Sequence, residues 1–217
     1  MSRTRYTQSG FSLVELIVAM AVFTIVITIT LGALLMLVGT NQQLQGQQSM
    51  MTNLSFALDS MTREIRTGTN YYCDSQNGIN GGSAGKKLFS NGTNLDADAY
   101  LDCANGNDSN RTYHGISFIE GGESITNAPD TRIVYFFDAS EHKIYRRVSG
   151  GNAESIVSSG IYIENAEFFV TGTDPLDPAN DEYQATVTII IEAKESSDST
   201  EDPTVVQTTI TQRTLDI

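Results

Sequence analysis

Glu15 is the residue of this chain whose charge most clearly needs compensation, because it is the only ionisable side chain in an apolar run from Phe11 to Val38. A carboxylate at mid-bilayer costs about 2.5–3.5 kcal/mol, so a buried one calls for a partner. The alternative is a carboxylate near the membrane edge that reaches headgroup water. Both readings first require that the apolar run cross a membrane.

The run is long enough to do so. Its roughly 28 residues would extend about 42 Å as a helix, which predicts a transmembrane segment over 11–38. An ordinary secretory signal has a short apolar core followed by a small-residue cleavage site, and the apolar run here is too long for such a core. Arg3 and Arg5 precede the run, so we expect a cytoplasmic N-terminus and place the chain after Val38 outside.

The block G-F-S-L-V-E-L-I-V-A-M, from Gly10 to Met20, resembles the class III signal of type IV pilins and type II secretion pseudopilins. This resemblance implies that a prepilin peptidase removes a leader of residues 1–10 by cutting between Gly10 and Phe11, and then methylates the new amine of Phe11. It also implies filament assembly. One helical turn, about 6 Å, separates Phe11 from Glu15, so the amine of one chain can approach the Glu15 carboxylate of its neighbour.

An amphipathic helix is predicted over 39–67. An apolar stripe runs through it with spacings of 7, 3, 4, 3 and 4 residues, which is one face of a helix. The stripe consists of Leu44, Met51, Leu54, Leu58, Met61 and Ile65. Gly68 follows as a stop signal, and no proline occurs before Pro129, so one helix from Phe11 to Thr67 is expected. The stripe fits the core face of a helix packed on a sheet better than a coiled-coil seam with a partner.

The remainder, 68–217, is predicted to be an extracytoplasmic β-rich domain. Residues 68–112 are dense in Gly, Asn, Ser and Asp, which predicts a long irregular loop. Strand-like runs bounded by turn residues follow, at 116–119, 132–137, 143–148, 161–170, 184–193 and 205–214. Residues 138–142 would turn the second run into the third. The predicted fold class is α+β, a long N-terminal helix packed on an antiparallel sheet, and it resembles the pilin fold.

A finer resemblance involves three short patterns. The helix end M-T-R-E-I-R (Met61 to Arg66), the pair Val134-Tyr135 before the predicted turn, and I-Y-R-R after it (Ile144 to Arg147) resemble the J-type minor pseudopilins. Together with the N-terminal block, they imply a minor subunit that helps to initiate or cap a fibre built mainly from another subunit.

Two cysteines, Cys73 and Cys103, both fall in the part expected outside the cytoplasm. An oxidising location favours a disulfide between them, whereas two unpaired thiols in a loop are the alternative. A metal site is not indicated, because the sequence has no C-x-x-C pair and neither histidine lies at ligand spacing.

No catalytic set emerges, so we expect no enzyme and no cofactor. His114 and His142 lie beside predicted strands without a matched nucleophile. The carboxylates of one acidic loop could supply oxygen ligands to calcium, but two prolines interrupt this loop, and a solvated loop without a metal fits it better. These carboxylates are Asp174, Asp177, Asp181 and Glu182. The acidic stretch from Asp198 to Asp202 is a weaker candidate for calcium binding.

The net negative charge of the chain limits the kinds of molecule that it can bind. Without its leader the chain has 11 basic and 26 acidic residues, a formal charge of −15. So acidic a surface argues against broad nucleic-acid contact, which depends on phosphate neutralisation. The resemblance implies other pilins, the prepilin peptidase and a membrane assembly platform as partners, in the cytoplasmic membrane and then in a filament. The alternative function is a membrane-anchored binding or sensor domain with an uncleaved signal anchor.

Overall fold

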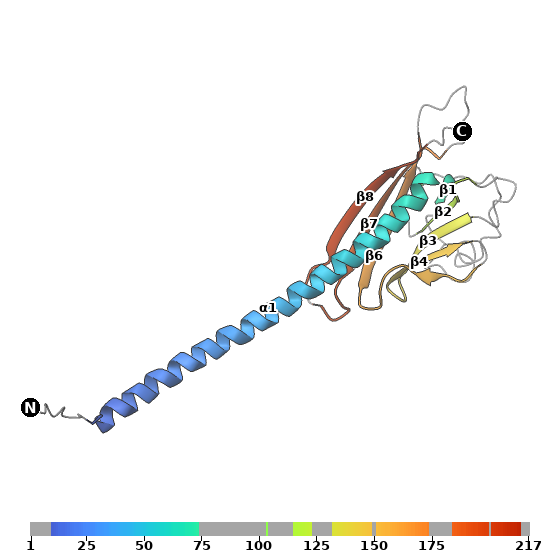
Figure 1. The fold of residues 1–217 in the computed structure, drawn as a ribbon. Coiled ribbons are helices and arrows are strands. Elements are labelled where there is room, and N and C mark those ends of the chain that lie inside the picture. Colours follow the sequence, from blue (N-terminus) through green and yellow to red (C-terminus); the bar gives the residue numbers. More distant parts are fainter. Residues whose placement is uncertain are drawn as a thin grey trace, which may run out of the picture. The chain divides into compact units, whose positions relative to one another are not determined.

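The computed structural model describes residues 10–73, 103, 115–122, 132–148, 151–173, 184–199 and 201–213. It divides into two compact units, Met1–Gly46 and Gln47–Ile217. A single helix, α1 (Leu13–Thr67), contributes to both units (Figure 1). The predicted helix is therefore confirmed, and it ends at the expected residue.

In the first unit, the large apolar side chains of α1 between Leu13 and Val38 are exposed. Among the described residues, α1 is the one helix long and apolar enough to cross a membrane. Its hydroxyl groups bond within the helix: Thr24 donates to Ala21 O at 2.9 Å, and Thr28 donates to Thr24 O at 2.8 Å. Thr30 does the same toward a carbonyl one turn back. An apolar surface with its polar groups satisfied internally suits a lipid environment.

In the second unit, α1 buries one face in the core. The buried residues are Met50, Leu54, Ala57, Met61 and Ile65. The predicted stripe is partly wrong, because Met51 is 41% exposed and Leu44 is 50% exposed. A 7-residue spacing drifts by about 20° per heptad on a straight helix, so the early members of the stripe fall beside the buried face.

Five strands form the first sheet, in the order β1-β2-β3-β4-β5 and antiparallel throughout. They are β1 (Thr69–Cys73), β2 (Gly115–Ile119), β3 (Arg132–Asp138), β4 (Lys143–Val148) and β5 (Glu154–Ser155). The predicted hairpin around 138–142 is confirmed as β3 and β4. The prediction of an irregular segment from residue 68 is wrong at its start, because 69–73 form β1 and pair with β2. Partnership with a distant strand outweighs the weak local signal there.

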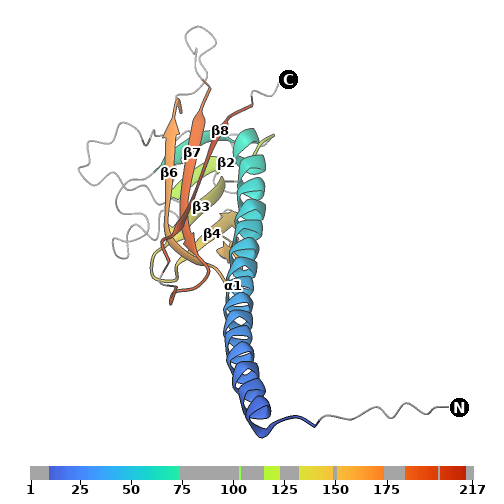
Figure 2. The same cartoon turned by 90° about the vertical axis from the view of Figure 1, so that its left-hand side faces the viewer.

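Three strands form a second sheet, in the order β6-β7-β8. They are β6 (Tyr162–Thr171), β7 (Thr186–Lys194) and β8 (Thr204–Thr211). Burial alternates along β7, so one face of this sheet lies in the core. The strands are antiparallel, as expected, but they form two sheets where one was expected. In Figure 2, both sheets lie on the same side of the C-terminal half of α1, and side chains from all three layers share one core.

The helix ends where the chain packs too tightly for a side chain. Gly68 N donates to Glu64 O and Ile65 O, each at 3.1 Å, and a Cβ on Gly68 would overlap the buried ring of Phe118. The end of β8 returns to the same place, since Arg213 N donates to Arg66 O at 2.8 Å. The C-terminal end of α1 is thus tied to both sheets.

Candidate functional site: the N-terminal helix and its attachment

The start of α1 is fully open. Phe11 is 84% exposed, and the first turn is closed by Leu16 N donating to Ser12 O at 3.2 Å. A Cβ on Gly10 would contact nothing within 4 Å. The predicted cleavage position between Gly10 and Phe11 therefore lies just before the helix, on accessible backbone.

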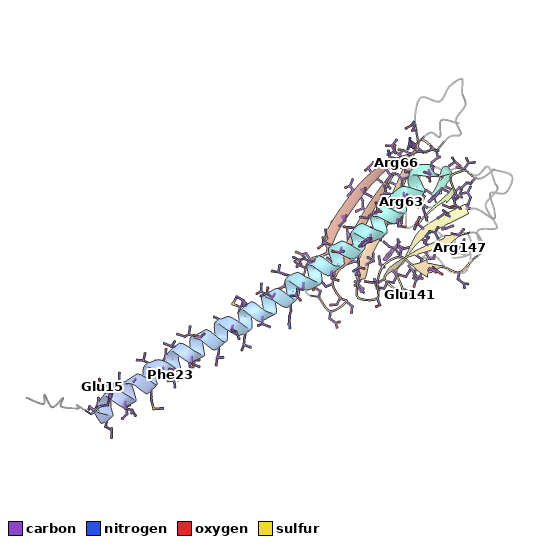
Figure 3. The ribbon with its side chains drawn as sticks, in the orientation of Figure 1. Glu15, Phe23, Arg63, Arg66, Glu141 and Arg147 are labelled. Atoms are coloured by element: carbon purple, nitrogen blue, oxygen red, sulfur yellow. A yellow bond between two sulfur atoms is a disulfide. The ribbon has the colours of Figure 1, made fainter. Side chains whose placement is uncertain are left out.

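Glu15 lies in the first helical turn and is exposed. No hydrogen bond or ion pair within the described residues engages its carboxylate, so it is available to a partner. Glu15 and five apolar residues line a groove of about 460 Å³. Two of the lining residues, Glu15 and Phe23, are labelled in Figure 3. The apolar neighbours are Phe11, Leu16, Ala19, Met20 and Phe23. This surface can accept an apolar side chain and, beside it, a cation.

The second half of α1 is fastened to the first sheet by one carboxylate. Glu64 accepts hydrogen bonds from Arg146 Nε at 2.9 Å and Arg146 Nη2 at 2.8 Å, and from the Tyr135 hydroxyl at 2.6 Å. We call these three residues the helix clamp. Burial and the bond to Glu64 raise the pKa of Tyr135, and the bond to Glu64 raises the pKa of Arg146. The clamp fixes the register of α1 against β3 and β4.

Sequence reasoning missed the clamp as an interaction, although its three residues all belong to the patterns behind the finer resemblance. It also missed two buried arginines. Arg132 is fully buried and donates to Ser117 Oγ at 3.2 Å. Arg147 is 1% exposed, and no other described residue forms a hydrogen bond with its guanidinium. Burial lowers the pKa of Arg147 to about 10. Nothing in the local sequence marks an arginine of a β-rich run as buried.

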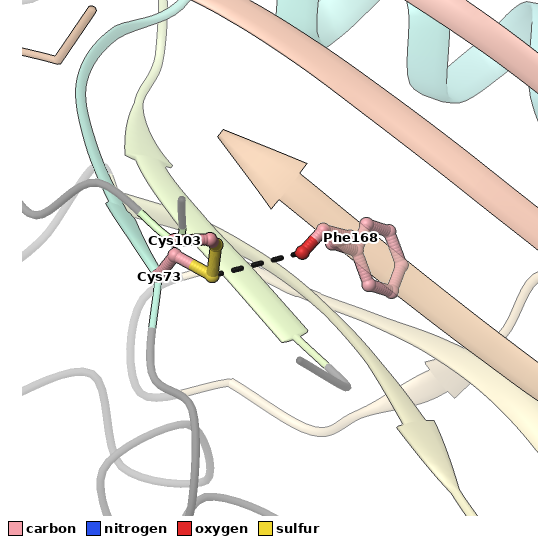
Figure 4. The surroundings of a disulfide bond; sticks show 3 residues. All are labelled: Cys73, Cys103 and Phe168. Carbon is pink, nitrogen blue, oxygen red and sulfur yellow. Dashed lines mark hydrogen bonds between the residues drawn. A yellow bond between two sulfur atoms is a disulfide. The ribbon is translucent and has the colours of Figure 1, made fainter. Parts of the chain in front are cut away.

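Cys73 and Cys103 are joined by a disulfide, as expected (Figure 4). Cys103 N donates to Val170 O at 2.9 Å, and Cys73 Sγ lies 3.8 Å from Phe168 O. The bond therefore fixes the end of β1, in the first sheet, beside β6 of the second.

Both ring nitrogens of His142 lie within hydrogen-bonding distance of residues of β6. Its Nδ1 lies 3.1 Å from Ile163 O, and its Nε2 lies 2.8 Å from the Tyr162 hydroxyl. These contacts tie the β3–β4 turn to the start of β6.

The described part of the chain contains no group of three or more His, Cys, Asp or Glu residues that could hold a metal. The candidate calcium ligands and the second histidine lie outside the described residues, so those expectations stay predictions. They are Asp174, Asp177, Asp181, Glu182 and His114.

Comparison with known proteins bears on the N-terminal segment. Residues 5–31 match the family described as the prokaryotic N-terminal methylation motif. No curated protein and no solved structure matches the chain. The match covers the end of the predicted leader, the predicted cleavage position, Glu15 and the first part of the apolar helix. The chain therefore carries the prepilin-type methylation motif of the type IV pilin and pseudopilin family at its N-terminus.

Proposed function

We propose that the chain is a minor pilin or pseudopilin, a structural subunit of a type IV pilus or a type II secretion-like filament. The observation that carries this proposal is the methylation motif at residues 5–31, on a helix whose apolar surface stays exposed. A soluble domain would have to cover such a surface, whereas a filament core or a bilayer covers it from outside.

The order of events is the one that the resemblance to prepilins implies. The chain sits in the cytoplasmic membrane with its leader inside. Prepilin peptidase cuts between Gly10 and Phe11, and the amine of Phe11 is methylated. An assembly platform then moves the helix out of the bilayer into a bundle of other pilin helices, and the globular domain faces outward. The exposed start of α1 supports access by the peptidase.

Glu15 sets the register between neighbouring helices during assembly. Its carboxylate has no partner among the described residues and borders an apolar groove, so it attracts the cationic amine of an incoming subunit. Glu15→Leu should leave cleavage intact and reduce the amount of the chain in filaments. Normal incorporation of this variant into filaments would contradict the pairing of Glu15 with the amine of a neighbouring subunit.

Within the class, the J-type minor pseudopilins are the finer assignment. The helix clamp supports it, because the residues that carry that resemblance act together to hold α1 on the sheet.

The mass of the N-terminus of the protein from native membranes tests the proposal. A mature chain that starts at singly methylated Phe11 is expected. An intact Met1 leader, in cells with an active prepilin peptidase, would contradict it and leave a membrane-anchored binding or sensor domain as the better description.

A further inference from the structure

The second sheet has two edge strands, β6 and β8, and they differ in what lies beside them. On the outer edge of β6, Ile163 N donates to His142 O at 3.1 Å, and Val170 O accepts from Cys103 N at 2.9 Å. Backbone from elsewhere in the domain therefore engages the edge of β6. In Figure 1, β8 is the outermost strand of its sheet, and none of the described elements lies beyond it on the side away from β7.

The register of β7 and β8 shows which backbone groups of β8 point outward. Gln212 N donates to Ala185 O at 2.8 Å, which identifies a hydrogen-bonded pair of the antiparallel ladder. Hydrogen-bonded pairs alternate along such a ladder with pairs whose N–H and C=O groups point away from each other. The residues of β8 with outward groups are therefore Val205, Gln207, Thr209 and Thr211. We call the outward N–H and C=O groups of these four residues the open edge.

One end of the open edge is closed by α1. Arg213 N is the next donor of the same outward series, and it donates to Arg66 O at 2.8 Å. At the other end, Pro203 precedes the strand and has no N–H to offer. Between these two points, no described residue forms a backbone hydrogen bond with the open edge.

The side chains of β8 do nothing to discourage strand addition. Proteins usually protect an edge strand with charged side chains, proline, a bulge or a very short length. β8 has eight residues, none of which is charged or proline, and its register with β7 is continuous. All of them except Gln207 are β-branched, the type that favours strands. The open edge is thus a regular template for one more strand.

The core under β8 is also incompletely covered. The core-facing residues of β7 are all buried: Val187, Ile189, Ile191 and Ala193. Facing the same way on β8, Thr204, Val206 and Thr208 are only half-buried, although Val206 packs against the core. Neighbouring strands lie about 4.8 Å apart, so a strand added to β8 would cover this margin of the core.

We propose that the open edge pairs with an extended segment of a neighbouring subunit, which is a different pilin of the same filament. This inference rests on the proposed function, because a minor subunit meets subunits other than its own copies. Main-chain hydrogen bonds supply the affinity in this kind of recognition, and the alternate side chains supply the specificity. A charged side chain placed against Val206 would lose its hydration, so the segment has uncharged side chains at its core-facing positions.

Hydrogen exchange at single-residue resolution tests the pairing on the unmodified chain. In the purified chain in detergent micelles, the amides of the open edge should exchange rapidly. Those of Val206, Thr208 and Ile210 bond to β7 and serve as the protected reference. In filaments, exchange at the open edge should slow several-fold, because pairing engages these amides. Equally rapid exchange in filaments overturns the proposal. Protection already present in the purified chain also overturns it, since this chain or a second copy would then occupy the edge.

A proline on β8 tests whether the pairing matters for assembly. Thr209→Pro removes one outward N–H and no bond to β7. Thr209→Val is the matched control, because it keeps the N–H while both variants lose the contact of the Thr209 hydroxyl with Thr188 Oγ1 at 3.0 Å. We expect several-fold less of the proline variant in filaments, a parental amount of the valine variant, and similar urea midpoints for the two purified proteins.

Equal incorporation of the two variants overturns the proposal. If the proline variant unfolds at lower urea, the exchange measurement, which needs no variant, decides. The N-terminal mass of the same chains separates the two proposals. A Phe11 start with unprotected open-edge amides in filaments overturns only the strand pairing, whereas an intact leader overturns the proposed function.

Discussion

Breaking the helix clamp should loosen the domain in a way that breaking a surface ion pair does not. Arg146→Met keeps the aliphatic stem and removes both bonds to Glu64, at 2.9 and 2.8 Å. Hydrogen bonds to charged groups contribute about 1.5–3 kcal/mol each when buried. Because the two side chains are 31% and 26% exposed, water recovers part of this. We expect a loss of about 2 kcal/mol in the free energy of unfolding.

The matched control is the pair of Arg63 with Asp59 on the outer face of the same helix. Its atoms lie 3.2 Å apart, and its side chains are 80% and 71% exposed. Arg63→Met should therefore cost less than about 0.5 kcal/mol. In a domain of this size, the two variants should differ in Tm by about 3–6 °C.

Urea unfolding of the full chain in detergent micelles measures both variants. The chain has nine tyrosines and no tryptophan, so near-ultraviolet circular dichroism of tyrosine reports the core. A double-mutant cycle of Arg146→Met with Glu64→Gln isolates the pair, with an expected coupling of about 1–2 kcal/mol. Equal losses for Arg146→Met and Arg63→Met would refute the reasoning, as would an additive cycle.

Three further outcomes follow from the same domain. Reducing the disulfide of Cys73 and Cys103, which are 30 residues apart, should cost about 3–4 kcal/mol in urea unfolding; an unchanged midpoint would contradict this. Gly68→Ala should cost about 1–3 kcal/mol because its Cβ overlaps a buried phenylalanine ring, whereas Gly160→Ala, in open space, should be near neutral in thermal melts. Folding raises the pKa of Tyr135, so the unfolded state loses this proton first and stability falls as pH rises above about 10. Tyr135→Phe should weaken that alkaline loss, and an identical pH profile for variant and parent would count against it.

Local signals predicted what is local in this fold. Gly68 marked the end of α1, and the turn residues 138–142 marked the β3–β4 hairpin. The processing and assembly residues, Gly10, Phe11 and Glu15, could also be proposed from one short block. Each of these features depends on neighbours a few residues away.

Features that depend on distant partners could not be predicted. The clamp joins Glu64 to residues 71 and 82 positions later, and no periodicity records such a pairing. The buried position of Arg147 depends on what covers its strand, not on its residue type. The division of the strands into two sheets is likewise decided by tertiary packing around α1.

The hydroxyl groups of α1 have a consequence for transfer between environments. Thr24, Thr28 and Thr30 already donate to carbonyls of their own helix, at 2.9, 2.8 and 2.7 Å. These bonds travel with the helix, so none has to be exchanged when lipid chains are replaced by protein side chains. The helix then presents nearly the same apolar surface to a lipid bilayer and to a bundle of protein helices. Extraction from a bilayer would thus require little chemical rearrangement of the segment, and Glu15 would be the group whose surroundings change most.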